Sequence, residues 1–182
     1  MAPFTNSLFS RIGGSTAFVK CGLVLSGTGP QKAELMQKTP VGVVVETVLI
    51  LDDDAAVLEC IAYVLRFEHY AVLEASTGLQ AIDTGRQCGP LSLFVTDIEL
   101  PDASGIDIAL KLVALYPDLP VLVISGNPMD WWASKDVSNF SRFLPNKVDF
   151  LEKPFSASEL KMRVRNLIGR TIGKKSQGSQ AA

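Results

Sequence analysis

The chain has 182 residues, of which 47% are hydrophobic and 20% are charged, so it is long enough and apolar enough to form a packed core. No apolar run approaches the roughly 18 residues that a membrane-spanning helix needs. Three widely spaced cysteines and a single histidine, without a CxxC pattern, exclude a disulfide framework and a zinc site. We therefore expect a protein with reduced thiols and a cytoplasmic location.

Charge is distributed unevenly along the chain. Residues 46–160 contain 18 of the 19 acidic residues but only 7 of the 17 basic ones, whereas residues 161–182 contain six basic residues and no acidic one. This pattern predicts one acidic domain at 46–169, a leader at 1–45 and a flexible basic tail at 170–182. The leader is expected to be disordered; the alternatives are that translation begins at Met36 or that the leader contains a transit peptide. The basic tail lacks interleaved aromatic residues and so does not indicate nucleic-acid binding.

From residue 47 onward, short apolar runs alternate with stretches of helical spacing. The apolar runs predict strands at 48–51, 70–73, 91–96, 120–124 and 148–151. Helical spacing predicts helices at 57–65, 79–88, 106–113 and 160–168, and the last begins with a capping box of Ser156 and Glu159. Residues 127–146 contain two prolines and receive no helix boundaries. Strand and helix alternating at this rhythm predict an α/β fold, a parallel sheet with helices on both faces.

Polar side chains stand where four of the predicted strands end. They are Asp52, Asp53 and Asp54 after the first strand, Asp97 after the third, Ser125 after the fourth and Lys153 after the fifth. In an open parallel sheet these ends lie along one edge, so we expect the side chains to meet. Clustered carboxylates without histidine or cysteine favour Mg²⁺. Beside it, a lysine contacts phosphoryl oxygens, a serine donates a hydrogen bond, and a carboxylate acts as a nucleophile that forms an aspartyl-phosphate.

Four segments resemble the receiver domain of two-component response regulators. They are VLILDDD at 48–54, FVTDIELPDASG at 94–105, VLVISG at 121–126 and DFLEKPF at 149–155. The resemblance covers 46–169 and implies a flavodoxin-like, doubly wound five-stranded sheet of order 2-1-3-4-5. Because only 13 residues follow Gly169, it implies a stand-alone, chemotaxis-regulator-like receiver that is not an enzyme.

The resemblance also implies roles for individual residues and a cis peptide bond between Lys153 and Pro154. Matched position by position, the phosphoacceptor is Asp97, the Mg²⁺ ligands are Asp52, Asp53, Asp97 and the backbone carbonyl of Glu99, and the phosphoryl-binding and switch residues are Lys153, Ser125 and Phe150. The variable positions Glu99 and Asn127 resemble those that tune the lifetime of the phosphoryl group.

The partners implied by the resemblance are proteins. A sensor histidine kinase or a histidine phosphotransfer protein donates the phosphoryl group to Asp97, and a downstream target binds at the face of the fourth helix, fifth strand and fifth helix. Neither direct DNA binding nor membrane binding is expected, and a phosphorylation-dependent homodimer stays open. Trp131 and Trp132, near that face, are either a partner-binding anchor or a cap on the core.

Two alternatives remain open. One is a receiver fold that serves as a binding module without phosphorylation. The other is a haloacid-dehalogenase-type phosphatase, whose opening motif Asp52-x-Asp54 resembles. That motif requires Thr or Val where Ala56 stands, its acidic motif after the lysine has only Glu159 available, and Asp97 is left without a role.

Overall fold

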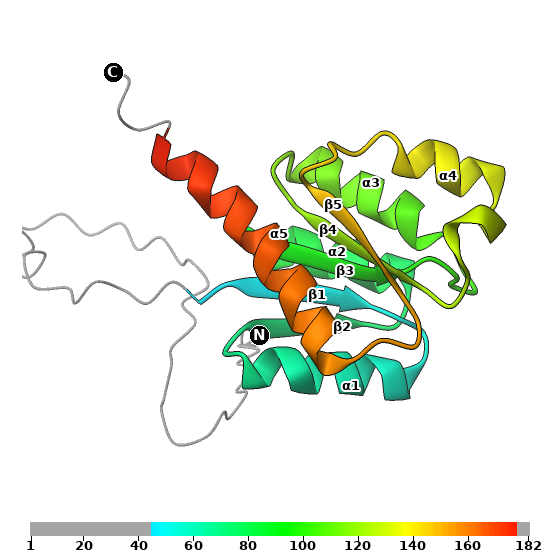
Figure 1. Cartoon of the computed structure of the whole chain (residues 1–182), viewed down its shortest axis with the longest axis horizontal. Coiled ribbons are helices and arrows are strands. Elements are labelled where there is room, and N and C mark those ends of the chain that lie inside the picture. The colour runs from blue at the N-terminus through cyan, green and yellow to red at the C-terminus, as the bar shows by residue number, and fades with distance from the viewer. Residues whose placement is uncertain (1–44, 178–182) are drawn as a thin grey trace, which may run out of the picture. The chain divides into compact units, whose positions relative to one another are not determined.

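The computed structural model describes residues 45–177, with side chains described as far as 169. These residues form a five-stranded parallel sheet in the order β2-β1-β3-β4-β5, as predicted (Figure 1). The strands are β1 (Thr47–Leu51), β2 (Ala71–Ala75), β3 (Leu93–Asp97), β4 (Val121–Ser125) and β5 (Val148–Glu152). The helices are α1 (Ala55–Phe67), α2 (Gly78–Gln87), α3 (Gly105–Leu115), η3 (Met129–Trp131), α4 (Ser134–Phe140) and α5 (Ala157–Gln177). The predicted leader lies, apart from Val45, outside the described residues, as does Met36.

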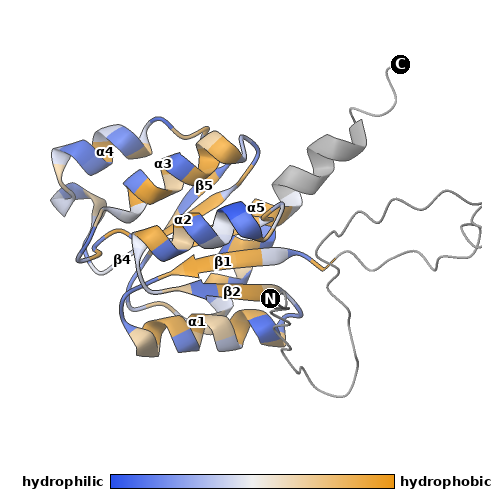
Figure 2. Cartoon of the chain, turned by 180° about the vertical axis from the view of Figure 1, so that it is seen from behind, coloured by the Kyte–Doolittle hydropathy of each residue, from blue (hydrophilic) through white to orange (hydrophobic). Residues whose placement is uncertain are grey.

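Two apolar layers cover the sheet, because side chains alternate between its faces along each strand. In β1, Val48 and Ile50 pack with α1 and α5, whereas Leu49 and Leu51 pack with α2 and α3. All four side chains are fully buried. The strands therefore read as continuous apolar runs, as expected for a parallel sheet buried on both faces. Figure 2 shows this contrast, with apolar strands and helices that alternate between polar and apolar residues.

Helix starts are set by local capping. Asp54 accepts hydrogen bonds from the backbone N–H groups of Ala56 and Val57 and so caps α1. The predicted capping box is confirmed: Ser156 and Glu159 bond each other's backbone N–H groups at 2.8 and 3.2 Å. The Asp54 cap starts α1 shortly after β1 ends, and the Ser156 and Glu159 box starts α5 shortly after β5 ends.

Two expectations differ from the structure. Helix α5 continues through residues 170–177, so this part of the predicted flexible tail is helical. Cys60 and Cys88 fall in the predicted helices 57–65 and 79–88, and small residues in such helices are expected at or near the core. Both are exposed. Among the described residues, no helix is both long enough and apolar enough to cross a membrane.

Candidate functional site

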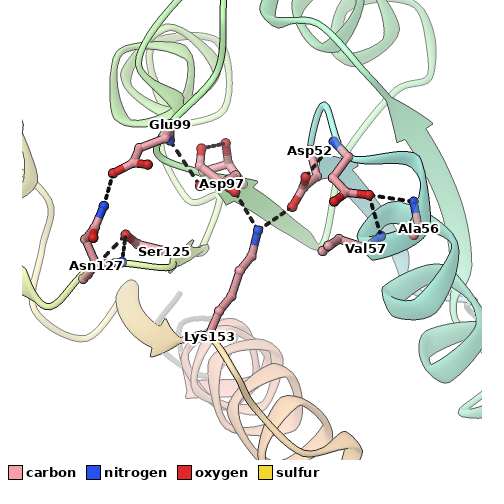
Figure 3. Close-up of polar contacts among 10 residues, drawn as sticks. Asp52, Ala56, Val57, Asp97, Glu99, Ser125, Asn127 and Lys153 are labelled. Atoms are coloured by element: carbon pink, nitrogen blue, oxygen red, sulfur yellow. Dashed lines mark hydrogen bonds and ion pairs between the residues drawn. The ribbon is translucent and has the colours of Figure 1, made fainter.

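Three charged side chains meet at the carboxyl edge of the sheet. The Lys153 Nζ lies 2.9 Å from Oδ2 of Asp52 and 2.5 Å from Oδ2 of Asp97 (Figure 3). Both carboxylates are buried, with Asp52 1% and Asp97 9% exposed. A buried carboxylate requires a partner, and the ammonium group supplies one for both. The prediction that these strand ends converge is therefore confirmed for these three residues.

Backbone N–H groups fix the second oxygen of each carboxylate. Oδ1 of Asp52 accepts from the N–H of Asp54 at 2.9 Å, and Oδ1 of Asp97 accepts from the N–H of Glu99 at 3.0 Å. Each aspartate ends or follows a strand, so the chain turns back at once and presents its next N–H groups to the side chain. The two carboxylates are thus held in one orientation.

Ser125 ends β4, the strand next to Asp97. Its neighbour Ile124 pairs with Asp97 in the sheet, and its own side chain is fully buried. The Ser125 Oγ donates to the backbone oxygen of Asn127 at 3.1 Å and accepts from the Asn127 N–H at 3.0 Å. The side chain of Asn127 in turn donates to the carboxylate of Glu99, as Figure 3 shows. The loops after β3 and β4 are therefore joined beside Asp97.

Lys153 is placed by the end of β5. Its backbone N–H donates to the Ser125 oxygen at 2.8 Å, which ties the ends of β4 and β5 together. The peptide bond between Lys153 and Pro154 is cis, as the resemblance implied.

The environment shifts the pKa of two site groups. Burial raises the pKa of Asp52 above its ordinary value, although hydrogen bonds from Lys153 and Asp54 oppose the shift. Burial lowers the pKa of Lys153, but hydrogen bonds and charge attraction from Asp97 and Asp52 outweigh it, so the net shift is upward. The ammonium form therefore persists at neutral pH.

Asp53 and Phe150, the other two predicted site residues, are not hydrogen-bonded to the Lys153 ammonium group in this arrangement. Asp53 is exposed beside Asp52. Phe150 is partly buried in β5 and packs edge-on against Trp132, with ring centroids 5.0 Å apart. Within the part of the chain that the structure describes, no three His, Cys, Asp or Glu side chains are grouped closely enough to hold a metal ion by themselves.

Two site features escaped the sequence analysis. Gly105 opens α3, and a Cβ there would overlap the backbone oxygen of Asp97. Its place at the end of segment 94–105, directly after the Asp97 loop, is the sequence signal for this close approach. The second feature is the indole of Trp132, whose Nε1 donates to the Asn127 oxygen at 3.0 Å. No local pattern indicates that contact.

Comparisons with known proteins agree with this geometry. Residues 48–165 match the model of the response regulator receiver domain. The transcriptional regulatory protein CreB of Escherichia coli is 33% identical over 125 residues, which are 69% of this chain and 52% of that protein. A CheY-like receiver domain protein of Methanospirillum hungatei has a TM-score of 0.63 at 22% identity, and the match covers 71% of this chain and 98% of that one.

A further solved structure similar in fold is the response regulator TrrA of Thermotoga maritima in complex with Mg²⁺ and beryllofluoride. Its TM-score is 0.56 at 22% identity, and the match covers 68% of this chain and 99% of that one. The chain spans about half the length of the curated relatives it matches. The chain belongs to the response regulator receiver domain family, whose members are signalling modules of two-component systems.

Proposed function

We propose that the chain is a phosphorylation-controlled switch whose phosphoacceptor is Asp97. The observation that carries this proposal is the pairing of the Asp97 and Asp52 carboxylates by one ammonium group, Lys153. A single cation between two buried carboxylates leaves a net negative site. Such a site favours the binding of an additional cation. The Lys153 ammonium group, which already contacts Asp97, can pair with the negative charge that a phosphoryl group would add there.

The proposed chemistry is transfer of a phosphoryl group to a carboxylate oxygen. A lone pair on Asp97 attacks phosphorus, the bond between phosphorus and the donor's leaving atom breaks, and the leaving group takes that electron pair. Lys153 stabilises charge on the phosphoryl oxygens, and the N–H of Glu99 holds the carboxylate in place. The Ser125 hydroxyl then donates a hydrogen bond to a phosphoryl oxygen and keeps its proton, which requires it to give up its hydrogen bond to the Asn127 backbone oxygen.

Mg²⁺ fits this donor set. The ion is commonly bound by one or two carboxylates together with waters and substrate phosphate, so it does not need a preformed group of three adjacent side chains. We assign Asp52, Asp53, Asp97 and the backbone carbonyl of Glu99 as its ligands, with Asp53, exposed next to the buried Asp52, as the more direct ligand of that pair. When bound, the ion supplies positive charge to the phosphoryl oxygens. The choice of ion is supported by a protein of similar fold, TrrA, whose structure contains Mg²⁺ and beryllofluoride.

The proposed partners follow from the family. The phosphoryl donor is a sensor histidine kinase or a histidine phosphotransfer protein, and the downstream target binds the face of α4, β5 and α5. The stand-alone organisation and the expectation of no direct DNA binding stay predictions, because similar proteins include transcriptional regulators. The cytoplasmic location is also a prediction.

The test is incubation with acetyl phosphate and Mg²⁺, followed by intact-protein mass. We expect wild type to gain one phosphoryl group and Asp97→Asn to gain none. Asp83→Asn, at an exposed position of α2, is the matched carboxylate control and should still be modified. If folded wild type gains no mass from acetyl phosphate or from a panel of histidine kinases, the binding module without phosphorylation becomes the better proposal.

A further inference from the structure

Trp132 contacts two parts of the switch at once. Its Nε1–H donates to the backbone oxygen of Asn127 at 3.0 Å. Its ring meets Phe150 of β5 edge-on, with centroids 5.0 Å apart and planes at 78°. The same ring meets Phe140 of α4, with centroids 5.5 Å apart and planes at 79°. One indole therefore connects the loop after β4 with β5 and α4.

The Asn127 oxygen receives two donors. One is the indole N–H of Trp132 and the other is the Ser125 hydroxyl, at 3.1 Å. A carbonyl oxygen has two lone pairs, so both bonds are satisfied together. Ser125 has only one hydroxyl proton. That proton forms a hydrogen bond either to the Asn127 backbone oxygen, as in this structure, or to a phosphoryl oxygen on Asp97.

We propose that Trp132 is a positioning residue of the switch, an inference that rests on the proposed function. The indole N–H holds the Asn127 oxygen where Ser125 donates to it, and thereby stabilises the arrangement in which Ser125 is turned away from a phosphoryl group. The ring extends this restraint to Phe150 and α4. Release of the Ser125 hydroxyl and rearrangement of the α4 and β5 side chains are thus linked through a single side chain.

The neighbouring tryptophan does not share this role. The residue Trp131 is 77% exposed, whereas Trp132 is partly covered and belongs to the apolar layer on the α2 and α3 face. Trp131 and Trp132 are the only tryptophans in the chain. Each can therefore be replaced while the other is left as a single fluorescent reporter.

The main test compares wild type with Trp132→Phe, which keeps an aromatic ring but removes the N–H donor. Calorimetric titration with beryllofluoride and Mg²⁺ measures how readily the site accepts a phosphoryl mimic. We expect half-saturation at a concentration about two- to tenfold lower in Trp132→Phe, the effect of losing one hydrogen bond from the competing arrangement. Equal half-saturation in the two proteins contradicts the proposal.

A double-mutant cycle separates positioning from a general loosening of the loop. In a Ser125→Ala background there is no hydroxyl to release, so Trp132→Phe should leave half-saturation unchanged. The same change in both backgrounds means that Trp132 acts independently of Ser125, and it overturns the proposal. Trp131→Phe is the matched control and should titrate like wild type.

Fluorescence supplies a readout that keeps Trp132 in place. In Trp131→Phe the only indole is Trp132, and its emission should change as beryllofluoride and Mg²⁺ saturate the site. In Trp132→Phe the only indole is the exposed Trp131, whose emission should stay constant over the same range. A change confined to Trp131 contradicts the proposal, and this measurement stands even where Trp132→Phe fails to fold.

The outcomes distinguish this inference from the function on which it rests. If wild type binds the mimic but Trp132→Phe titrates identically, only the role of Trp132 is wrong. If wild type neither binds the mimic nor gains a phosphoryl group, the proposed function fails and the role of Trp132 fails with it.

Discussion

Gly105 decides how closely α3 approaches the strand that carries Asp97. Its backbone N–H bonds the Ile98 oxygen at 3.0 Å, and a Cβ would overlap the backbone oxygen of Asp97 and crowd the Thr96 hydroxyl. The residue is the first of α3, a position where helix propensity alone favours alanine over glycine by up to about 1 kcal/mol. Propensity and packing therefore predict opposite effects of a methyl group.

We expect packing to decide the outcome. Gly105→Ala should lower the free energy of unfolding by about 3 kcal/mol, because the obstructing atom is rigid backbone rather than a movable side chain. Gly169→Ala is the matched control: it lies in α5 with nothing within 4 Å of the added Cβ, and it should be neutral or stabilising by up to about 1 kcal/mol. Urea denaturation measures both, and a neutral Gly105→Ala would falsify the close-approach argument.

The residues of the site differ in how well the sequence predicted them. Asp52, Asp97 and Lys153 were predicted to meet because strand ends in a parallel sheet share one edge, and the structure brings them together. The contact between Trp132 and Asn127 was not foreseen because it depends on the path of the loop through η3. Tertiary packing determines the path of this loop, so the local spacing of residues does not predict it.

At the scale of elements, α4 is attached to α3 largely by polar contacts. None of its residues is buried. Asp107 of α3 accepts from Lys135 at 2.6 Å and from Asn139 at 2.7 Å, while Ser104 donates to Asp136 at 2.5 Å. No boundaries were predicted for α4, because a helix without a buried apolar stripe has no periodicity to detect. Such an element belongs to the low-stability end of a fold.

Removing the shared acceptor should release α4. In Asp107→Ala we expect amide hydrogen exchange in α4 to accelerate about tenfold or more, since two hydrogen bonds to α3 are lost. Exchange in β3 and β4 should change far less. Asp130→Ala removes an exposed acid from η3 and serves as control. Uniform acceleration across the sheet would contradict a local attachment.

The ends of α1 and α5 are joined by charge. Glu68 follows the last residue of α1, where a negative charge is unfavourable to the helix dipole, but it pairs with Arg165 and, at 3.6 Å, with Lys161. Partial burial raises the pKa of Glu68, yet these two cations outweigh it and hold the pKa below its ordinary value of 4.5. The carboxylate form is therefore favoured in the folded chain.

The sign of the pH dependence follows from that shift. A lowered folded pKa contributes stability above pH 4.5, and this contribution is lost as pH falls through the folded value. Glu68→Gln should be less stable than wild type at pH 7, and the difference should shrink as the pH falls below 4.5 and through the lowered folded pKa. Thermal unfolding across pH measures it. Glu59→Gln, at an exposed position of α1, is the control, and a pH-independent difference for Glu68→Gln would exclude the ion-pair explanation.

Helix α5 was predicted to exist, but its C-terminal end was predicted less well than its presence. All five strands lie within a few residues of their predicted positions, because buried apolar runs define them. The end of α5 was placed too early, at Gly169. Once a helix is nucleated, each further residue adds a hydrogen bond without needing new packing, so a polar segment continues it without an apolar signal.

At the scale of the whole domain, the site joins segments that are distant in sequence. The bond between Lys153 and Asp52 connects residues 101 positions apart and links β5 to β1. The ligands proposed for Mg²⁺ and the phosphoryl group come from β1, β3, β4 and the end of β5. A ligand held there contacts only the folded chain, because unfolding separates every one of these groups.

Binding at this site should therefore stabilise the whole domain. With beryllofluoride and Mg²⁺ in excess, the free energy of unfolding of wild type should rise by about 1.4 kcal/mol for each tenfold increase of ligand concentration above Kd. Asp97→Asn should show no such rise, because it lacks the carboxylate to which the phosphoryl mimic binds. Urea denaturation of both proteins at several ligand concentrations measures the effect. A rise of equal slope in Asp97→Asn would mean that the ligand binds elsewhere, and the assignment of this strand-end site would then be wrong.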